Sequence, residues 1–312
     1  MSPGTVAAPA GAGLPLATVR TLLRGVVDYA GLFPPASLGM LAAVSEYAEH
    51  KLAAHSWALG RFVVPAARLD EFETEAANLL PRDAARSWAL SALLGSDLEE
   101  DIERVERFND RHRDPREGAV MVDTVELKVN SSRDVSHAGD LLDRRFDTYM
   151  EVPLGGDPGD LIAAVGGTMA KAKIRTGGVT PDTFPSSAQV TGFIAACVAR
   201  DVAFKATAGL HHPWRNEYRL TYAADAPCGT MFGFLNVLLA AAAVRAGWPV
   251  ADATALLEER DPGAVRFQPD RIRWRERELS LDHLTRARDL ITAIGSCSFV
   301  EPIGGLQASA LL

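Results

Sequence analysis

The chain has 312 residues, of which 47% are hydrophobic and 23% are charged, and its formal net charge is −8. This composition excludes the disordered and fibrous classes of protein. The acidic balance argues against a nucleic-acid partner, because duplex binding needs a large basic surface. The length suits one α/β barrel, which typically has about 250 residues.

Neither a membrane partner nor secretion is expected. The longest apolar run, residues 232–244, is too short to span a bilayer and predicts a helix of the core or of a dimer contact. Residues 1–16 lack the basic start of a signal peptide and predict a flexible tail. Cys197, Cys228 and Cys297 form no CxxC pair, which favours a reducing compartment and so a cytoplasmic protein.

Residues 17–58 predict a helical lead-in to the barrel. Residues 17–29 have helical spacing, residues 30–35 break it, and residues 38–52 resume it. The segment from Asp28 to Pro35 combines titratable groups with a stiff turn. Two interpretations of it are open, a lid across the barrel mouth and a proline-stiffened connection between helices.

Residues 60–210 predict six βα units. Short apolar runs recur about every 23 to 32 residues, the spacing of parallel strands joined by helices. Residues 97–111 and 186–200 predict two of the helices, the second capped by Ser186. The six predicted strands are residues 61–65, 88–94, 119–129, 148–152, 170–176 and 202–207.

Residues 211–312 predict barrel closure and elaborations. Helices are expected at residues 233–246, 251–259 and 281–294, and a hairpin at residues 265–280. The run Arg271 to Arg277 alternates and leads into acidic residues, which is typical of a solvated surface hairpin. We predict a single TIM-like (β/α) barrel domain at residues 17–312, with an N-terminal helical extension and a C-terminal hairpin and helix elaboration. Strands seven and eight are unassigned: the hairpin or residues 295–299 close the barrel, or the sheet is open and doubly wound.

Polar side chains share one face of four predicted strands. Successive side chains of a strand point to opposite faces of the sheet. If the apolar positions of a barrel strand pack against the helices, the positions between them face the barrel interior. At the carboxyl ends of barrel strands such groups form active sites, and buried lysines there need carboxylate partners. The predicted inward residues are Glu126, Lys128, Tyr149, Glu151, Lys171, Lys173, Arg175 and Lys205.

Lys173 and Lys205 both precede glycine-containing loops, where backbone N–H groups can approach an anion. Residues 172–178, Ala-Lys-Ile-Arg-Thr-Gly-Gly, and residues 204–210, Phe-Lys-Ala-Thr-Ala-Gly-Leu, resemble the paired lysine strands of class I aldolases of the deoxyribose-phosphate aldolase type. The resemblance implies that Lys173 forms an imine with the substrate and that Lys205 tunes it. Arg175 and the run from His211 to Arg215 depart from that family's pattern.

Arg175 and Arg215 indicate a small substrate that carries a carboxylate or phosphate. The predicted substrate-binding residues are Glu126, Lys128, Arg175, Thr176, Gly177, Gly178, His212 and Arg215.

Adjacent residues on a strand point in opposite directions, so at most one of His211 and His212 is expected in the site. General acid/base catalysis, metal binding with distant carboxylates or cysteines, and a loop or core position are open alternatives. Cys297 is interpreted as a buried small thiol, because no base is identified beside it.

We therefore predict a lyase or aldolase-like enzyme acting on a small anionic carbonyl compound without a cofactor. Its predicted catalytic residues are Lys173, Lys205, Glu151 and His211. One alternative is a metal-assisted isomerase or hydrolase that uses His211 with Glu126 and Glu151. Another is a barrel that binds small anions without turnover. Whether the chain forms a homo-oligomer is open.

Overall fold

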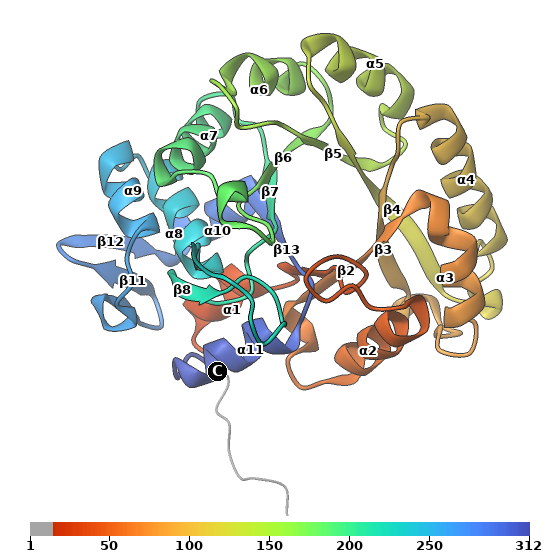
Figure 1. Ribbon diagram of the computed structural model, residues 1–312, viewed down its shortest axis with the longest axis horizontal. Helices are drawn as coiled ribbons and strands as arrows, with labels where there is room; N and C mark the ends of the chain where they lie inside the picture. The colour runs from red at the N-terminus through yellow and green to blue at the C-terminus, as the bar shows by residue number, and fades with distance from the viewer. Residues whose placement is uncertain (1–14) are drawn as a thin grey trace, which may run out of the picture.

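Parallel strands close into a barrel in the computed structural model, which describes residues 15–312 (Figure 1). The strand order is β1-β13-β7-β6-β5-β4-β3-β2, and each neighbouring pair is parallel. The TIM-like α/β barrel is therefore confirmed, and the open doubly wound alternative is wrong. The predicted flexible tail is residues 1–16, of which residues 1–14 lie outside the described residues. The barrel strands are β1 Val27–Tyr29, β2 Leu59–Pro65, β3 Trp88–Leu93, β4 Val120–Lys128, β5 Asp147–Glu151, β6 Lys171–Arg175, β7 Phe204–Thr207 and β13 Ile291–Ser296.

The six strands expected between residues 61 and 207 are confirmed as β2 to β7. Apolar, β-branched runs such as residues 62–64 of β2 suit the pleated surface between a barrel interior and its helices. Helices follow the strands and surround the barrel in Figure 1. Those that follow β1 to β7 are α2 Met40–Leu52, α3 Leu69–Ala76, α4 Leu98–Arg111, α5 Ser132–Leu142, α6 Gly159–Gly166, α7 Ser187–Ala199 and α8 Phe234–Arg245.

Helix α7 begins where its capping residue predicts. The Ser186 hydroxyl accepts a hydrogen bond from the Gln189 backbone N–H, and the Gln189 side chain accepts one from the Ser186 backbone N–H. This reciprocal pair satisfies two donors that a helix start leaves free. The predicted cap is confirmed.

The predicted helix over residues 17–29 is wrong in its second half, which contains a barrel strand. Helix α1 spans Ala17–Leu23, Gly25 takes a left-handed φ of +57°, and β1 follows at Val27–Tyr29. All three residues of β1 are buried, and they pair with β2 and β13. A strand of three buried residues has no visible alternation in the sequence, so only its neighbours distinguish it from a helix.

The last barrel strand also lies inside a predicted helix. Helix α10 ends at Leu290 rather than residue 294, and β13 begins at Ile291. Ile291 and Thr292 are β-branched, and the strand that they begin pairs with β1 and β7. Barrel closure by the hairpin is therefore wrong, and residues 295–296 belong to the closing strand only as its end.

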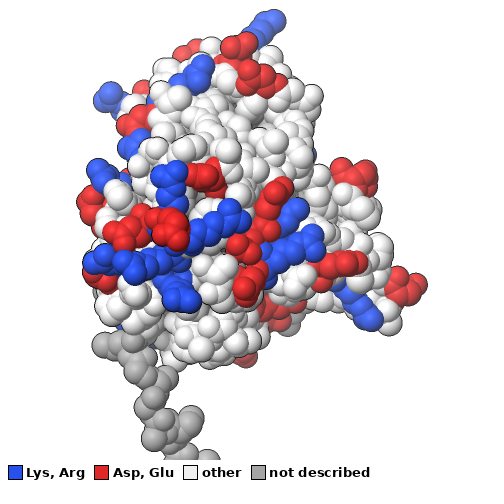
Figure 2. Space-filling view, turned by 90° about the vertical axis from the view of Figure 1, so that its left-hand side faces the viewer, with Lys and Arg blue, Asp and Glu red and all other residues white. Residues whose placement is uncertain are grey.

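The hairpin region forms a separate antiparallel sheet of β10 Val265–Phe267, β11 Arg271–Trp274 and β12 Arg277–Ser280. Ile272 and Trp274 are buried, whereas Arg273 is exposed and pairs with Glu278. Figure 2 shows basic and acidic side chains interspersed on the side of the molecule that carries this sheet. The predicted solvated surface hairpin is confirmed.

Helix α8 belongs to the core of the chain. Every residue from Phe234 to Val244 is buried, and the helix packs against α7, α9 Val250–Leu257 and α10 Leu281–Leu290. Two further elements lie near the barrel mouth, the ribbon of β8 Asn216–Arg219 and β9 Cys228–Met231 and the helix α11 Val300–Ala308. Across residues 15–312, no helix has the length and apolarity needed to cross a membrane.

Candidate active site

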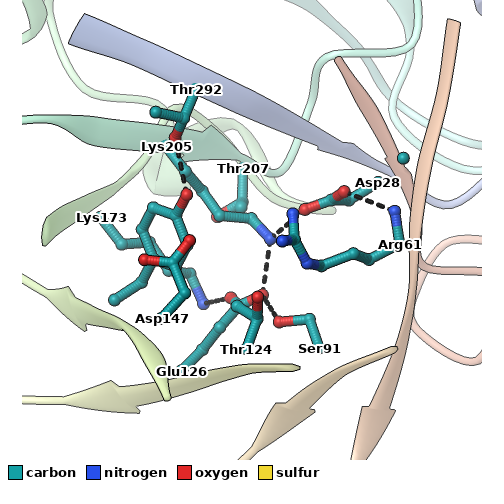
Figure 3. Close-up of polar contacts among 12 residues, drawn as sticks. Asp28, Arg61, Ser91, Thr124, Glu126, Asp147, Lys173, Lys205, Thr207 and Thr292 are labelled. Carbon is teal, nitrogen blue, oxygen red and sulfur yellow. Dashed lines mark hydrogen bonds and ion pairs between the residues drawn. The ribbon is translucent and has the colours of Figure 1, made fainter. Parts of the chain in front are cut away.

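Two lysines on neighbouring strands share one carboxylate inside the barrel. Lys173 of β6 and Lys205 of β7 stand opposite each other in the strand register, and Figure 3 shows both side chains reaching toward Glu126 of β4. The Lys173 Nζ lies 2.8 Å from Glu126 Oε2, and the Lys205 Nζ lies 2.6 Å from Glu126 Oε1. We call these three residues, with Glu151 and Asp28, the lysine network.

The other two carboxylates of the lysine network bind one lysine each. The Glu151 Oε2 lies 3.0 Å from the Lys173 Nζ, and the Asp28 Oδ2 lies 2.5 Å from the Lys205 Nζ. Asp28 also accepts a hydrogen bond of 2.8 Å from the Arg61 backbone N–H. Two ammonium groups are thus held by three carboxylates, which compensates the burial of their charge.

Burial and neighbouring charges shift the pKa values of the lysine network in opposite directions. Burial alone would raise the pKa of Glu126, but the two lysine ammonium groups hold it well below its usual range. Burial would lower the pKa of Lys205, but Asp28 and Glu126 raise it above its usual range. Glu126 is therefore a carboxylate and Lys205 an ammonium at neutral pH.

The two lysines differ in their access to the cavity. Lys205 is 0% exposed and Lys173 is 6% exposed, and both line a cavity of about 260 Å³ at the carboxyl ends of the strands. Phe33, Pro34 and Pro35 line the same cavity, so the segment predicted as a lid or a helix connection does lie at the mouth. A cavity of this size suits a small molecule.

Arg175 and Gly178 line the cavity, in positions to contact the anionic group of a substrate. Arg175 is exposed at the end of β6 and lines both the cavity and an adjoining hollow that also contains Glu151 and Gly177. Thr176 is buried, and its hydroxyl donates to the Ala208 carbonyl at 2.8 Å, so it joins two loops.

Three predicted binding residues lie away from the cavity. Lys128 is exposed at the end of β4, beyond the layer that holds Glu126, where its ammonium is solvated. His212 stacks on Tyr218, with ring centroids 3.6 Å apart. The Arg215 guanidinium packs over Phe232 at 4.9 Å from the ring centroid instead of facing the cavity. The prediction that these residues face the site is corrected.

Lys171 faces the interior but at the wrong depth for the site. It begins β6, and its Nζ lies 2.7 Å from Asp147 and 5.4 Å from the Tyr149 ring centroid. The alternation of side chains along β6 therefore predicted correctly that Lys171 faces the barrel interior. Lys171 lies at the start of the strand, however, and the cavity lies at its end.

Asp28 and Ser91 were not predicted as members of the site. Ser91 donates a hydrogen bond of 2.6 Å to Glu126 Oε1. Asp28 lies between Val27 and Tyr29 in the buried strand β1. A carboxylate in the middle of an apolar run is rare, and this feature of the sequence could have identified Asp28 as a site residue.

His211 lies in the cavity wall together with Cys297. The His211 Nδ1 lies 3.1 Å from Glu301 Oε2, and the Cys297 Sγ lies 3.9 Å from His211 Nε2. Cys297 is buried, as the sequence predicts, but a base that the sequence did not reveal, His211, lies beside it. Strands β7 and β13 are neighbours in the closed barrel, so His211 and Cys297, which follow them, lie together although they are 86 positions apart in the sequence.

The metal-assisted alternative needs His211, Glu126 and Glu151 at one site, but the structure places them in two separate clusters. Glu126 and Glu151 bind lysines, and His211 pairs with Glu301. Within residues 15–312, no group of three or more His, Cys, Asp or Glu side chains is arranged to hold a metal ion.

Comparisons of the chain with protein-family models, with curated proteins and with solved structures give no match.

Proposed function

We propose that this barrel is a lyase of the aldolase type, in which the Lys173 amine forms an imine with a small anionic carbonyl compound. The observation that carries the proposal is the contrast between the two lysines. Both lysines line the cavity and each contacts two carboxylates, but Lys205 is 0% exposed whereas Lys173 is 6% exposed and is the lysine that a substrate can reach. The resemblance of the two lysine strands to class I aldolases supports the same assignment.

Imine formation needs a free amine and a group that moves protons. Lys173 gives a proton to Glu151, 3.0 Å away, and its nitrogen forms a bond to the substrate carbonyl carbon. The carbonyl π electrons move to the oxygen, which takes up the proton held by Glu151 and then a second proton from the nitrogen, and leaves as water. The iminium that remains carries a positive charge beside Glu126, whose carboxylate is held ionised by Lys205.

The iminium then serves as the electron sink for carbon–carbon cleavage. A base removes the proton of the hydroxyl on the β-carbon, and the oxygen forms a carbonyl with that carbon as the bond between the α- and β-carbons breaks. The electrons of the broken bond form an enamine with the iminium. The released fragment is an aldehyde or ketone. Protonation of the enamine carbon and hydrolysis by water return Lys173, and His211 in the cavity wall is placed to move a proton in these steps.

Lys205 acts as a fixed positive charge in this scheme. Its pKa lies above its usual range because of Asp28 and Glu126. It therefore stays protonated while Lys173 reacts, and Arg175 at the rim of the cavity binds the substrate's carboxylate or phosphate.

Borohydride trapping tests the proposal. The protein is incubated with a panel of small keto acids, aldehyde acids and their phosphate counterparts, reduced, and weighed by mass spectrometry. We expect a stable adduct with at least one compound, and its loss in Lys173→Arg, which keeps a cation beside Glu126 and Glu151. If the intact protein gives no adduct with any compound, the barrel that binds small anions without turnover becomes the better account.

A further inference from the structure

A second group of reactive side chains lies at the same cavity as the lysine network. It consists of Cys297, His211, Glu301 and Tyr222, which we call the thiol cluster. Cys297 follows β13, His211 follows β7 and Glu301 lies in the first turn of α11, so these three residues lie at the carboxyl ends of barrel strands. That end of an α/β barrel is where catalytic groups gather.

The thiol cluster brings a nucleophile, an imidazole and a carboxylate close together. Glu301 Oε2 lies 3.1 Å from the Nδ1 of His211, and the Cys297 Sγ lies 3.9 Å from the other ring nitrogen and 3.7 Å from Nδ1. The Tyr222 hydroxyl lies 3.6 Å from the Cys297 Sγ and 3.1 Å from Glu301 Oε2. Such contacts are often loose before a substrate binds.

The charges within the thiol cluster favour the imidazolium form of His211 near neutral pH. Burial disfavours the imidazolium, but hydrogen bonds with Cys297 and Glu301 outweigh it and raise the pKa of His211 to about 9. Burial would raise the pKa of Glu301, but His211 and Tyr222 lower it below its usual range. The groups that contact the His211 ring are the thiol of Cys297, the carboxylate of Glu301 and, 3.5 Å from Nδ1, the hydroxyl of Ser296.

The other two cysteines of the chain are natural controls for Cys297. Cys297 is 5% exposed and lines the cavity, so a small reagent reaches it from there. Cys197 is inside helix α7, where burial raises the pKa of its thiol. Cys228 is exposed on β9.

We propose that Cys297 is a second covalent nucleophile of the cavity, which adds to the carbonyl carbon of a small anionic aldehyde with His211 as its proton partner. The His211 imidazolium gives a proton to the carbonyl oxygen as the sulfur bonds to the carbonyl carbon and the π electrons move to the oxygen, and the proton of the sulfur then restores the imidazolium. The product is a thiohemiacetal, and no oxidant or further reactant is consumed.

The aldehyde class follows from the walls of the cavity. A volume of about 260 Å³ admits a compound of a few carbons, and Arg175 at the rim favours one with a carboxylate or phosphate. The addition does not require the Lys173 imine, so the thiol cluster and the lysine network can be tested separately.

Alkylation with iodoacetamide tests the nucleophile. Near neutral pH we expect the peptide containing Cys297 to be alkylated roughly tenfold or more faster than that containing Cys228, despite its lower exposure. His211→Asn is expected to abolish the difference, and Glu301→Gln to reduce it. The comparison between two cysteines of the unaltered protein needs no variant to fold. Alkylation of Cys297 no faster than that of Cys228 would overturn the proposal.

Glyoxylate labelled at its aldehyde carbon tests the electrophile. We expect a thiohemiacetal carbon resonance in the nuclear magnetic resonance spectrum of the protein, present in Lys173→Arg and absent in Cys297→Ser. A resonance that survives in Cys297→Ser, or none in Lys173→Arg, contradicts the proposal. Borohydride adducts at Lys173 without this resonance would support the lyase proposal and overturn the proposal for Cys297. The resonance without any borohydride adduct at Lys173 would support the proposal for Cys297 and overturn the lyase proposal.

Discussion

Each carboxylate oxygen of Glu126 binds a different lysine, which makes this residue the centre of the site. The Oε1 atom also accepts the Ser91 hydroxyl hydrogen bond. Removing one partner from a buried ion pair leaves an uncompensated charge, whereas an exposed pair contributes little.

Glu126→Gln therefore destabilises the protein by about 3 kcal/mol, because two buried ammonium groups lose their shared anion. Urea unfolding followed by circular dichroism measures this change. The control is Glu276→Gln on the exposed turn between β11 and β12, with an expected change within about 0.5 kcal/mol. Equal effects of the two substitutions would show that the network does not stabilise the fold.

His211 makes the stability depend on pH at the alkaline side. Its pKa rises from 6.5 to about 9 on folding, so its contribution is complete below about pH 6.5 and is lost as the pH rises through about 9. The stability lost on His211→Asn should therefore shrink by on the order of 2 kcal/mol across that range. Urea unfolding at several pH values measures it.

The matched control is His137→Asn, because His137 is exposed on α5. Its effect on stability should stay within about 0.5 kcal/mol. A His211→Asn effect that stays constant or grows with rising pH would contradict the ion pair with Glu301.

At the scale of elements, the strands that the sequence revealed are those with enough length to show a pattern. Strands β2 to β7 combine apolar runs with loops and amphipathic helices. Strand β1 has three residues, and β13 continues directly from α10, so neither has a boundary of its own in the sequence. Both are specified by pairing with each other and with β2 and β7, which are contacts between distant parts of the chain.

The junction of α1 and β1 depends on the left-handed backbone of Gly25. Gly25→Ala is expected to destabilise the protein by about 1 kcal/mol, since a side chain there has open space but an unfavourable φ of +57°. The control is Gly192→Ala in α7, where a Cβ also meets open space but the backbone is helical, and a gain of about 1 kcal/mol is expected. Thermal unfolding of both variants measures the difference, and a shared sign would refute this account of the junction.

At the scale of the whole molecule, barrel closure assembles the site. Alternation along single strands was enough to predict Glu126, Glu151, Lys173 and Lys205 as inward residues. It could not predict that Asp28 meets Lys205 across 177 positions, because that contact exists only once β13 and β1 close the barrel. Cys297 and His211 meet for the same reason.

Identifying the lysine that carries a trapped substrate tests the central claim most directly. After borohydride reduction with a reactive carbonyl compound, proteolysis and mass spectrometry assign the added mass to a peptide and a residue. The account predicts the mass on Lys173, with Lys205 and Lys171 unmodified, because Lys205 is 0% exposed and Lys171 lies at the other end of β6. An adduct on Lys205 would contradict it.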